Sequence, residues 1–410
     1  MAKRKIVIYF THKESLGHTM RVLTIIKALM SKFGEDAAIT VFHAGKRQDF
    51  FTPPEGLTWI DLPYPYHSKL DFKRSRQFSF TTPVYAKLRS NLMLKMLKKI
   101  KPDVFITEFF PFGREECRFE LLPILGYLKS SGTKIYASIG YPYIVRTNIN
   151  ILLNHCNYYE KFFIHTPERL EYEFLSKDIT SPVYKAAYDR TFKHIKEKIR
   201  YTGYIMPFNS SSLKDPQAIK DSFKTGGKKL VVVTRGGGPR CPRVVTGSIL
   251  SAKFLPKNKF IFIIAAGPST SDKEMALFKK LQRSVKNNKI HIFKYLPDLP
   301  SYLNACDVSV GMAGYNTSVP LLYLRKPSIF IPAKEDPETA LGYCSEQISR
   351  AKLMNKYLGS CVLDYHKFYP QGLAKKILQT LDHGVAPFAS RIKNGWFKGA
   401  DNTADLIMHE

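Results

Sequence analysis

The feature that most constrains the fold is an alternation of short apolar segments with longer amphipathic ones. It begins near the N-terminus and restarts near the middle of the chain. Such alternation is typical of parallel sheets whose strands are joined by right-handed helical crossovers. The length of 410 residues also favours at least two domains. The sequence therefore predicts an α/β protein with two doubly wound parallel-sheet domains.

The strands predicted for the first half are 5–10, 37–44, 103–110, 134–140, 161–166 and 201–205. Those predicted for the second half are 229–234, 259–266, 289–295, 307–313, 328–333 and 361–365. A stretch rich in Ser and Pro separates the halves, so we expect a first domain at 1–206, a linker at 207–227, a second domain at 228–390 and a final segment at 391–410. Ligands of such domains bind at the carboxyl ends of the strands, which predicts a site in the cleft between the domains.

The charge of the chain is strongly one-sided. It has 63 Lys and Arg residues against 34 Asp and Glu, a formal net charge of +29. This surplus predicts attraction to anions, whether nucleic acid, anionic lipid or a phosphorylated substrate.

Two further features bear on the compartment. The 6 cysteines are scattered and none forms a CxxC pair, which argues against a structural zinc site or a disulfide framework and fits a reducing environment. The apolar run after the basic N-terminus is too short for a signal peptide, and no window has the length of a spanning helix. We expect a cytoplasmic protein, or one bound to the cytoplasmic face of a membrane.

The segment SLGHTMR (15–21) lies between the first predicted strand and a helical pattern. Gly17 allows a sharp turn there, and the helix N-terminus that follows suits a phosphate group. His18 near that end is a candidate general base. A simple turn with a polar capping residue is the alternative interpretation.

A second glycine-rich segment, TRGGGPR (234–240), directly follows the strand predicted at 229–234. Gly236, Gly237 and Gly238 would let backbone N–H groups approach a pyrophosphate closely. The segment matches neither the Rossmann fingerprint nor the P-loop pattern. The alternative is a flexible turn at the end of a strand.

Two more candidate positions lie further along the second half. Gly314 precedes Asn316, Thr317 and Ser318, any of which is suited to cap the following helix, and the glycine would again admit an anion. Glu346 and Gln347 begin the helical pattern at 346–358, where a carboxylate and an amide can pair with sugar hydroxyls. The alternative for Glu346 is stabilisation of the helix dipole.

The segment 64–80 interleaves aromatic residues with Lys and Arg. Three interpretations remain open for it: an acceptor-binding or interfacial loop, a segment that binds single-stranded nucleic acid, and an ordinary solvated basic loop.

Taken in order, the Gly-His pair, the glycine loop, MAGYNT (312–317) and EQISRAKLM (346–354) resemble the MurG-like GT-B glycosyltransferases, with the family 28 C-terminal domain. They are most similar to an uncharacterised bacterial branch of predicted glycosyltransferases. The resemblance extends over nearly the whole chain. It implies two Rossmann-like domains that face each other across a cleft, an acceptor domain followed by a nucleotide-sugar donor domain, and a final helix within 391–410 that crosses back to the first domain.

The resemblance also implies roles for the candidate residues. Gly236 to Gly238 and the turn from Gly314 to Thr317 would face the donor pyrophosphate, with Gly17 at the corresponding turn of the first domain. Glu346 and Gln347 would face the sugar or ribose. Neither a metal ion nor a separate cofactor is implied, because helix dipoles and backbone N–H groups would stabilise the leaving diphosphate.

One departure from the family pattern concerns Pro320. It stands where the family carries a glutamate that holds the donor ribose, and proline cannot supply that contact. We therefore expect one of three things: an altered contact to the ribose, a ribose contact supplied by Glu346, or a donor other than a UDP-sugar.

The leading hypothesis is an inverting transferase that moves a hexosyl or N-acetylhexosaminyl group from a nucleotide-diphosphate sugar, with UDP-sugar as the expected donor, to a glycan or lipid-linked acceptor. His18 is the expected base, with Glu108 or Glu115 in reserve, and the basic surplus would favour peripheral contact with an anionic membrane. One alternative is a UDP-sugar hydrolase of the pseudaminic acid pathway type, which has a similar GHVMR-like opening. The other is a non-catalytic protein that binds nucleic acid or anionic membranes; the leading hypothesis expects no nucleic-acid partner.

Overall fold

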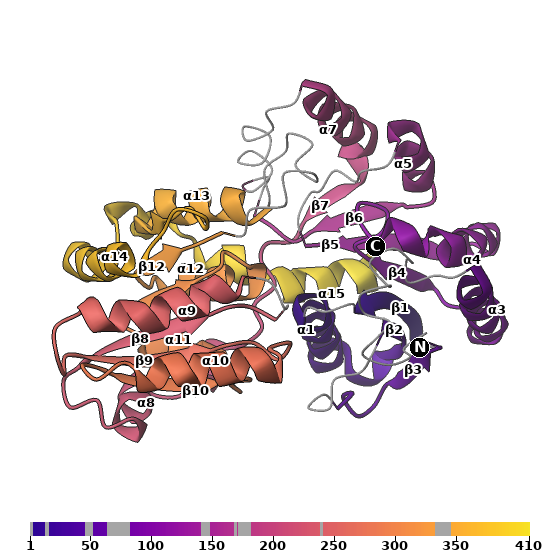
Figure 1. Cartoon of the computed structure of the whole chain (residues 1–410). Helices are drawn as coiled ribbons and strands as arrows, with labels where there is room; N and C mark the ends of the chain where they lie inside the picture. The colour runs from indigo at the N-terminus through magenta and orange to yellow at the C-terminus, as the bar shows by residue number, and fades with distance from the viewer. Residues whose placement is uncertain are drawn as a thin grey trace.

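The computed structural model describes residues 3–12, 16–45, 52–63, 83–140, 148–167, 170, 182–237, 241–332 and 346–410. Within them the chain forms two parallel sheets, each flanked by helices on both faces (Figure 1). The α/β class predicted from the sequence is therefore confirmed.

The first sheet has seven strands in the order β3-β2-β1-β4-β5-β6-β7. Its strands are β1 (Arg4–His12), β2 (Ala37–Gly45), β3 (Thr58–Leu62), β4 (Val104–Glu108), β5 (Lys134–Ile139), β6 (Lys161–Ile164) and β7 (Ile199–Tyr201). The accompanying helices are α1 (Leu16–Phe33), α3 (Pro83–Ile100), α4 (Arg118–Ser130), α5 (Ile149–Cys156) and α7 (Pro182–Ile195). The strand order reverses between β1 and β4, the place where doubly wound sheets bind ligands.

Alternation along β1 explains why this sheet is covered on both faces. Ile6 and Ile8 pack into one apolar cluster with residues of α1, whereas Val7 and Tyr9 pack into another with residues of α3 and α4. Successive side chains of a strand point to opposite faces. A strand that is apolar on both faces must therefore be buried between two layers of helices.

The second sheet has six strands in the order β10-β9-β8-β11-β12-β13. Its strands are β8 (Lys229–Thr234), β9 (Phe260–Ala265), β10 (Lys289–Phe293), β11 (Val308–Gly311), β12 (Ser328–Phe330) and β13 (Cys361–Val362). The helices are α8 (Pro216–Ser222), α9 (Pro242–Ser251), α10 (Asp272–Arg283), α11 (Leu299–Ala305), α12 (Tyr315–Leu324), α13 (Glu346–Leu358), α14 (Pro370–His383) and α15 (Gly399–His409). Here the order reverses between β8 and β11.

Three details differ from the sequence predictions. The edge strand β3 was not predicted, because its five residues are mostly half-exposed and give little apolar signal. The strand predicted at 201–205 is wrong: β7 ends at Tyr201, and residues 202–206 are buried because they pass from one domain to the other. The segment between the sheets also contains a helix, α8, with Asp215 as its N-cap.

The chain crosses between the domains a second time near its end, and the two crossings lie side by side. The Tyr204 N–H donates to the Trp396 carbonyl at 2.6 Å, and the Gly399 N–H donates to the Tyr204 carbonyl at 3.0 Å. Gly203 has a φ of +85°, and a Cβ there would lie 2.7 Å from the Trp396 oxygen. Only glycine therefore allows this close approach.

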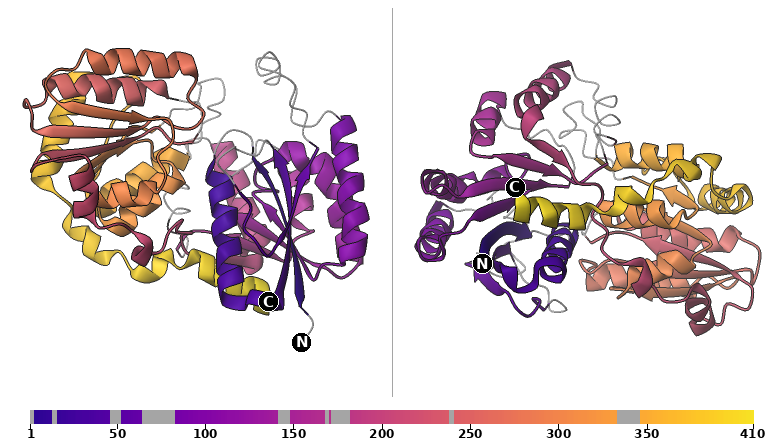
Figure 2. Two further views of the ribbon diagram at one scale, coloured as in Figure 1. Left: turned by 90° about the horizontal axis from the view of Figure 1, so that it is seen from below. Right: turned by 180° about the vertical axis from the view of Figure 1, so that it is seen from behind.

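Beyond the second crossing, α15 packs against α1 of the first domain, as the views from below and behind show (Figure 2). The Lys32 ammonium pairs with the Asp405 carboxylate at 2.6 Å, and the rings of Phe33 and His409 meet edge to face. The last helix of the chain is thus part of the surface of the first domain.

One stability prediction concerns a wholly buried ion pair beneath the first sheet. The Arg89 guanidinium on α3 binds the Glu120 carboxylate on α4, and Tyr9 donates a further hydrogen bond to that carboxylate. Glu120→Ala removes the carboxylate that pairs with the buried Arg89 guanidinium, so we expect the free energy of unfolding to fall by about 3–5 kcal/mol. Urea unfolding of the full chain measures this loss.

The control is Asp189→Ala, which removes the exposed Lys185–Asp189 pair of α7. An exposed pair contributes about 0–1 kcal/mol, so this variant should unfold close to the parent chain. Equal losses in the free energy of unfolding would show that the buried pair contributes no more to stability than the exposed one.

Candidate active site where the two domains meet

The centre of the candidate site is a contact between His18 and Glu108. His18 lies in the first turn of α1, and Glu108 is the last residue of β4. Because β1 and β4 are neighbours at the switch point, the two side chains meet: His18 Nδ1 is 2.8 Å from both Glu108 oxygens. The Glu108 side chain is fully buried, and that of His18 is 21% exposed.

Arg21 completes this cluster from the next turn of α1. Its Nη2 donates to Glu108 Oε1 and lies 3.3 Å from His18 Nδ1. Gly140, after β5, makes room for it, since a Cβ there would lie 1.9 Å from an Arg21 nitrogen. The carboxylate therefore faces a buried cation on one side and an imidazole on the other.

The electrostatics of the cluster fix its protonation. Burial raises the pKa of Glu108, but His18 and Arg21 together outweigh that effect and lower it from 4.5 to about 2. Burial lowers the pKa of His18 from 6.5; Glu108 acts in the opposite direction, and Arg114 and Arg21 lower it further. At neutral pH this gives a carboxylate beside a neutral imidazole, in which Nδ1 carries the proton and Nε2 keeps its lone pair.

The loop after β4 holds the aromatic wall of this cluster in an unusual backbone conformation. Phe109 has a φ of +70° and Arg114 one of +60°. The Phe109 ring meets the His18 ring edge to face, with centroids 5.4 Å apart. A Cβ on Gly113 would lie 2.1 Å from the Phe109 ring. Strained residues of this kind persist where the surroundings over-determine them, which is common at functional sites.

The glycine loop after β8 packs against the loop after β9. Gly236 has a φ of +87°, and a Cβ on Gly267 would lie 2.4 Å from the Gly236 oxygen. Ser269 Oγ donates to the Gly237 oxygen at 2.8 Å. The loop is thus held at the carboxyl edge of the second sheet, where an anion could meet its N–H groups. The third predicted residue, Gly238, lies outside the described residues.

The predicted capping at the next loop needs a correction. Asn316 and Thr317 were candidates for the N-cap of α12, but the N-cap is Gly314 and both residues lie in the first turn. An extended glycine at this position leaves the first N–H groups of the helix without a capping side chain. The Gly314 carbonyl already accepts the Thr317 N–H at 3.1 Å, so the Tyr315 and Asn316 N–H groups at the start of α12 are those that could face an anion. Pro320 is buried within α12 and presents no polar group.

Glu346 and Gln347 begin α13, as the sequence predicted. Arg350 lies one turn further along α13. Its Nη2 is 3.6 Å from Oε2 of the Glu346 carboxylate. Its Nη1 donates to the Ala313 carbonyl at 2.9 Å. Arg350 thus ties the start of α13 to the loop that precedes α12.

Tyr315, the first residue of α12, connects the two halves of the site. Its hydroxyl accepts a hydrogen bond from the Ile205 N–H at 2.7 Å and donates one to the His165 carbonyl at 3.3 Å. The guanidinium carbons of Arg21 and Arg350 each lie 5.5 Å from its ring centroid. Sequence reasoning missed Arg21, Tyr315 and Arg350. The available signal was helical spacing, since each arginine lies one turn after a predicted site residue.

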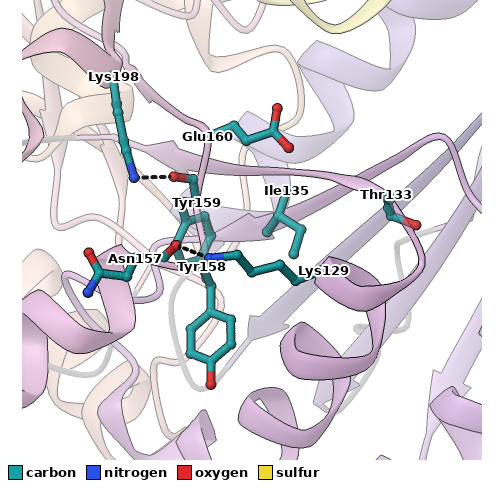
Figure 3. Close-up of a pocket in the computed structure, with 9 residues that line it drawn as sticks. Lys129, Thr133, Ile135, Asn157, Tyr158, Tyr159, Glu160 and Lys198 are labelled. Atoms are coloured by element: carbon teal, nitrogen blue, oxygen red, sulfur yellow. Dashed lines mark hydrogen bonds between the residues drawn. The ribbon is translucent and has the colours of Figure 1, made fainter.

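A cavity of about 380 Å³ lies at the opposite edge of the first sheet (Figure 3). It is lined around the amino ends of β5 and β6, and its two lysines are already engaged. Lys129 Nζ donates to the Asn157 carbonyl at 2.9 Å, and Lys198 Nζ to the Tyr159 carbonyl at 2.7 Å. These charges satisfy loop carbonyls, so the cavity has no part in the candidate site.

Two properties of the described residues concern metal binding and membrane insertion. No group of three or more His, Cys, Asp and Glu residues is arranged there to hold a metal ion. None of the helices described is both long and apolar enough to cross a membrane.

Two doubly wound parallel sheets, with the candidate site where they meet, define the GT-B fold class, and comparisons with solved structures agree. The chain aligns with MurG of Acinetobacter baumannii at a TM-score of 0.57 and 11% identity, over 99% of this chain and 100% of that one. It aligns with Arabidopsis thaliana UGT89C1 complexed with UDP-L-rhamnose at a TM-score of 0.62 and 13% identity, over 100% and 99% of the two chains.

The match to a family model lies in the second half of the chain. Residues 231–406 match the glycosyltransferase family 28 C-terminal domain. Over 144 residues the chain is 26% identical to the UDP-N-acetylglucosamine--N-acetylmuramyl-(pentapeptide) pyrophosphoryl-undecaprenol N-acetylglucosamine transferase of Alkaliphilus metalliredigens, which covers 35% of this chain and 38% of that enzyme. The matches span less than half the length of these relatives. The predicted resemblance to MurG-like GT-B glycosyltransferases is confirmed as a resemblance: the fold agrees over the whole chain, and residues 231–406 match the family 28 C-terminal domain.

Proposed function

We propose that the protein transfers a hexosyl or N-acetylhexosaminyl group from a nucleotide-diphosphate sugar to a glycan or lipid-linked acceptor. The observation that carries the proposal is the His18–Glu108–Arg21 cluster, which presents a neutral imidazole at the edge of the first domain that meets the second. The family 28 domain over residues 231–406 supports the nucleotide-sugar part.

In the proposed reaction, His18 Nε2 takes the proton of the acceptor hydroxyl as its oxygen attacks the anomeric carbon. The new C–O bond forms on one face while the bond to the diphosphate breaks on the other, which inverts the configuration. Glu108 holds Nδ1–H and stabilises the imidazolium that forms, the arrangement of an oriented general base. Backbone N–H groups of the Gly236–Gly237 loop and of the start of α12 would stabilise the leaving diphosphate, and we assign no step to a metal ion or separate cofactor.

A UDP-sugar is the proposed donor. The relative from Alkaliphilus is named for UDP-N-acetylglucosamine, and the Arabidopsis structure contains UDP-L-rhamnose. Pro320 has no polar side chain, so we assign the ribose contact to Glu346, at the start of α13. Gln347 beside it would bind sugar hydroxyls.

The proposed place of action is the cytoplasmic face of a membrane. The net charge of +29 supports contact with anionic lipid there. Peripheral contact would also bring the protein to a lipid-linked acceptor.

The experiment is a panel of UDP-, dTDP- and GDP-sugars, each incubated with the purified full chain alone and then with a membrane lipid extract. Released nucleotide is measured. Release that depends on the extract is the expected result and identifies the donor class. Equal release without the extract would overturn the transferase in favour of a sugar-nucleotide hydrolase. No release, together with no thermal shift by any nucleotide, would overturn donor binding itself.

A further inference from the structure

Tyr315 belongs to the second domain, but its polar contacts are with the first domain and with the chain that leaves it. The hydroxyl is held by the Ile205 N–H and by the His165 carbonyl, at 2.7 and 3.3 Å. The side chain is nearly buried, at 9% exposure. These two contacts fix where the ring lies relative to the first sheet.

The same ring contacts a guanidinium from each domain. Arg21 and Arg350 both have their guanidinium carbon 5.5 Å from its centroid, within the range at which a cation is attracted to an aromatic ring. Arg350 is fixed in turn by the Ala313 carbonyl. The Tyr315 ring thus connects Arg21 of the first domain to Arg350 at the start of α13, which is itself bound to the loop before α12.

Arg21 is the member of the catalytic cluster that needs such support. Its Nη2 binds Glu108, and Gly140 leaves just enough space for it on another side. The Tyr315 ring supplies a further contact, from the second domain. Without that ring, the long side chain would regain rotamers that point away from Glu108.

We propose that Tyr315 is a positioning residue, which holds Arg21 against Glu108 and thereby fixes the His18 imidazole only while the start of α12 is seated against the first domain. The importance of this for sugar transfer rests on the proposed function; the effect on His18 does not. The position of α12 in the second domain would then determine the orientation and pKa of the His18 imidazole in the first domain.

Within the part of the chain that the structure describes, charged and titratable groups face this contact from both domains. Glu108, Arg21 and Arg114 act on His18. On the side of Tyr315 lie Arg350, paired with Glu346, and His165, whose pKa burial and Arg21 lower to about 3. His165 therefore stays neutral across the range in which His18 titrates. Arg114 and Arg21 both lower the His18 pKa, and of these two Arg21 is the one that the Tyr315 ring contacts.

The two parts of the tyrosine can be tested separately. Tyr315→Phe keeps the ring beside both arginines and removes the hydroxyl contacts. Tyr315→Leu removes the ring, and Tyr315→Met is the second variant should the leucine chain not fold. Tyr323→Leu is the matched control, because Tyr323 lies two turns further along α12 and packs on Phe397.

The experiment follows the ring nitrogens of His18 by NMR in the ¹⁵N-histidine-labelled full chain, with His18→Asn to assign the signals. In Tyr315→Leu we expect a higher His18 pKa than in the parent chain, because Arg21 no longer lowers it. Tyr323→Leu should match the parent chain, and Tyr315→Phe, which keeps the ring but loses both hydroxyl contacts, should fall between the parent chain and Tyr315→Leu. Parent-like titration of His18 in both ringless variants would overturn the proposal.

Activity gives a second, independent result. If the panel identifies a donor, Tyr315→Leu should lower kcat about tenfold or more, with little change in the KM for that donor. An unchanged kcat would overturn the coupling to transfer. If the parent chain transfers no sugar while the His18 signals change as expected, the positioning role stands and the proposed function fails.

Discussion

Replacement of His18 by asparagine is expected to lower kcat about 10²–10⁴-fold, the usual contribution of a positioned general base. Asparagine keeps a polar side chain of similar length, so the cluster with Glu108 should remain folded. Nucleotide binding should change little, because the proposed diphosphate contacts lie in the second domain. The measurement compares kcat, and the Kd for the nucleotide by calorimetry, in parent and variant.

The dependence of kcat/KM on pH tests whether His18 acts as a base. Protonated His18 cannot accept a proton, so kcat/KM of the parent should fall on the acid side. Its midpoint should lie below 6.5, because burial lowers the pKa of His18. This acid limb should vanish in His18→Asn. The control is His383→Asn at the exposed end of α14; a His18 variant that kept the parent kcat and acid limb would show that another group is the base.

Replacement of Glu108 by glutamine has the second largest expected effect, a loss in kcat of about 10³-fold. A neutral amide can donate to Nδ1 as well as accept from it, so the imidazole loses its fixed tautomer. Arg21 also loses its buried carboxylate partner. The matched control is Glu115→Gln, in the loop after β4, where the carboxylate pairs with Arg118 instead; equal losses in the two variants would contradict the special role of Glu108.

The dependence of Tm on pH tests whether Glu108 is ionised in the folded chain, independently of any role in catalysis. Its pKa is lowered from 4.5 to about 2 in the folded chain, so the stabilisation is present above pH 4.5 and lost as the pH falls towards 2. The contribution is about 3 kcal/mol at neutral pH. The Tm of the parent should therefore fall more steeply over this window than that of Glu108→Gln. Parallel Tm curves would mean that Glu108 is not held ionised.

The sequence predicted most of the fold because its strands are short, apolar on both faces and regularly spaced. The failures have physical causes. β3 lies at an edge and is half-exposed, so it carries little apolar signal. Residues 202–206 are apolar because they are buried between the domains, and burial alone does not distinguish a strand from a crossing segment.

The candidate site was predictable as separate residues but not as an arrangement. His18 and Glu108 were found because each lies next to the carboxyl end of a predicted strand. Their contact depends on the adjacency of β1 and β4, which local patterns do not specify. Tyr315 was missed for a similar reason: within its own helix it is an ordinary aromatic residue, and its partners lie more than a hundred positions away.

The paired crossings between the domains have a mechanical consequence. Two chain segments, hydrogen-bonded to each other at Tyr204, Trp396 and Gly399, connect the two domains. Such a pair resists sliding and twisting far more than bending. If the domains move relative to each other, we therefore expect a rotation about an axis through these crossings. Each closing movement would return the start of α12 to the same place against the first sheet.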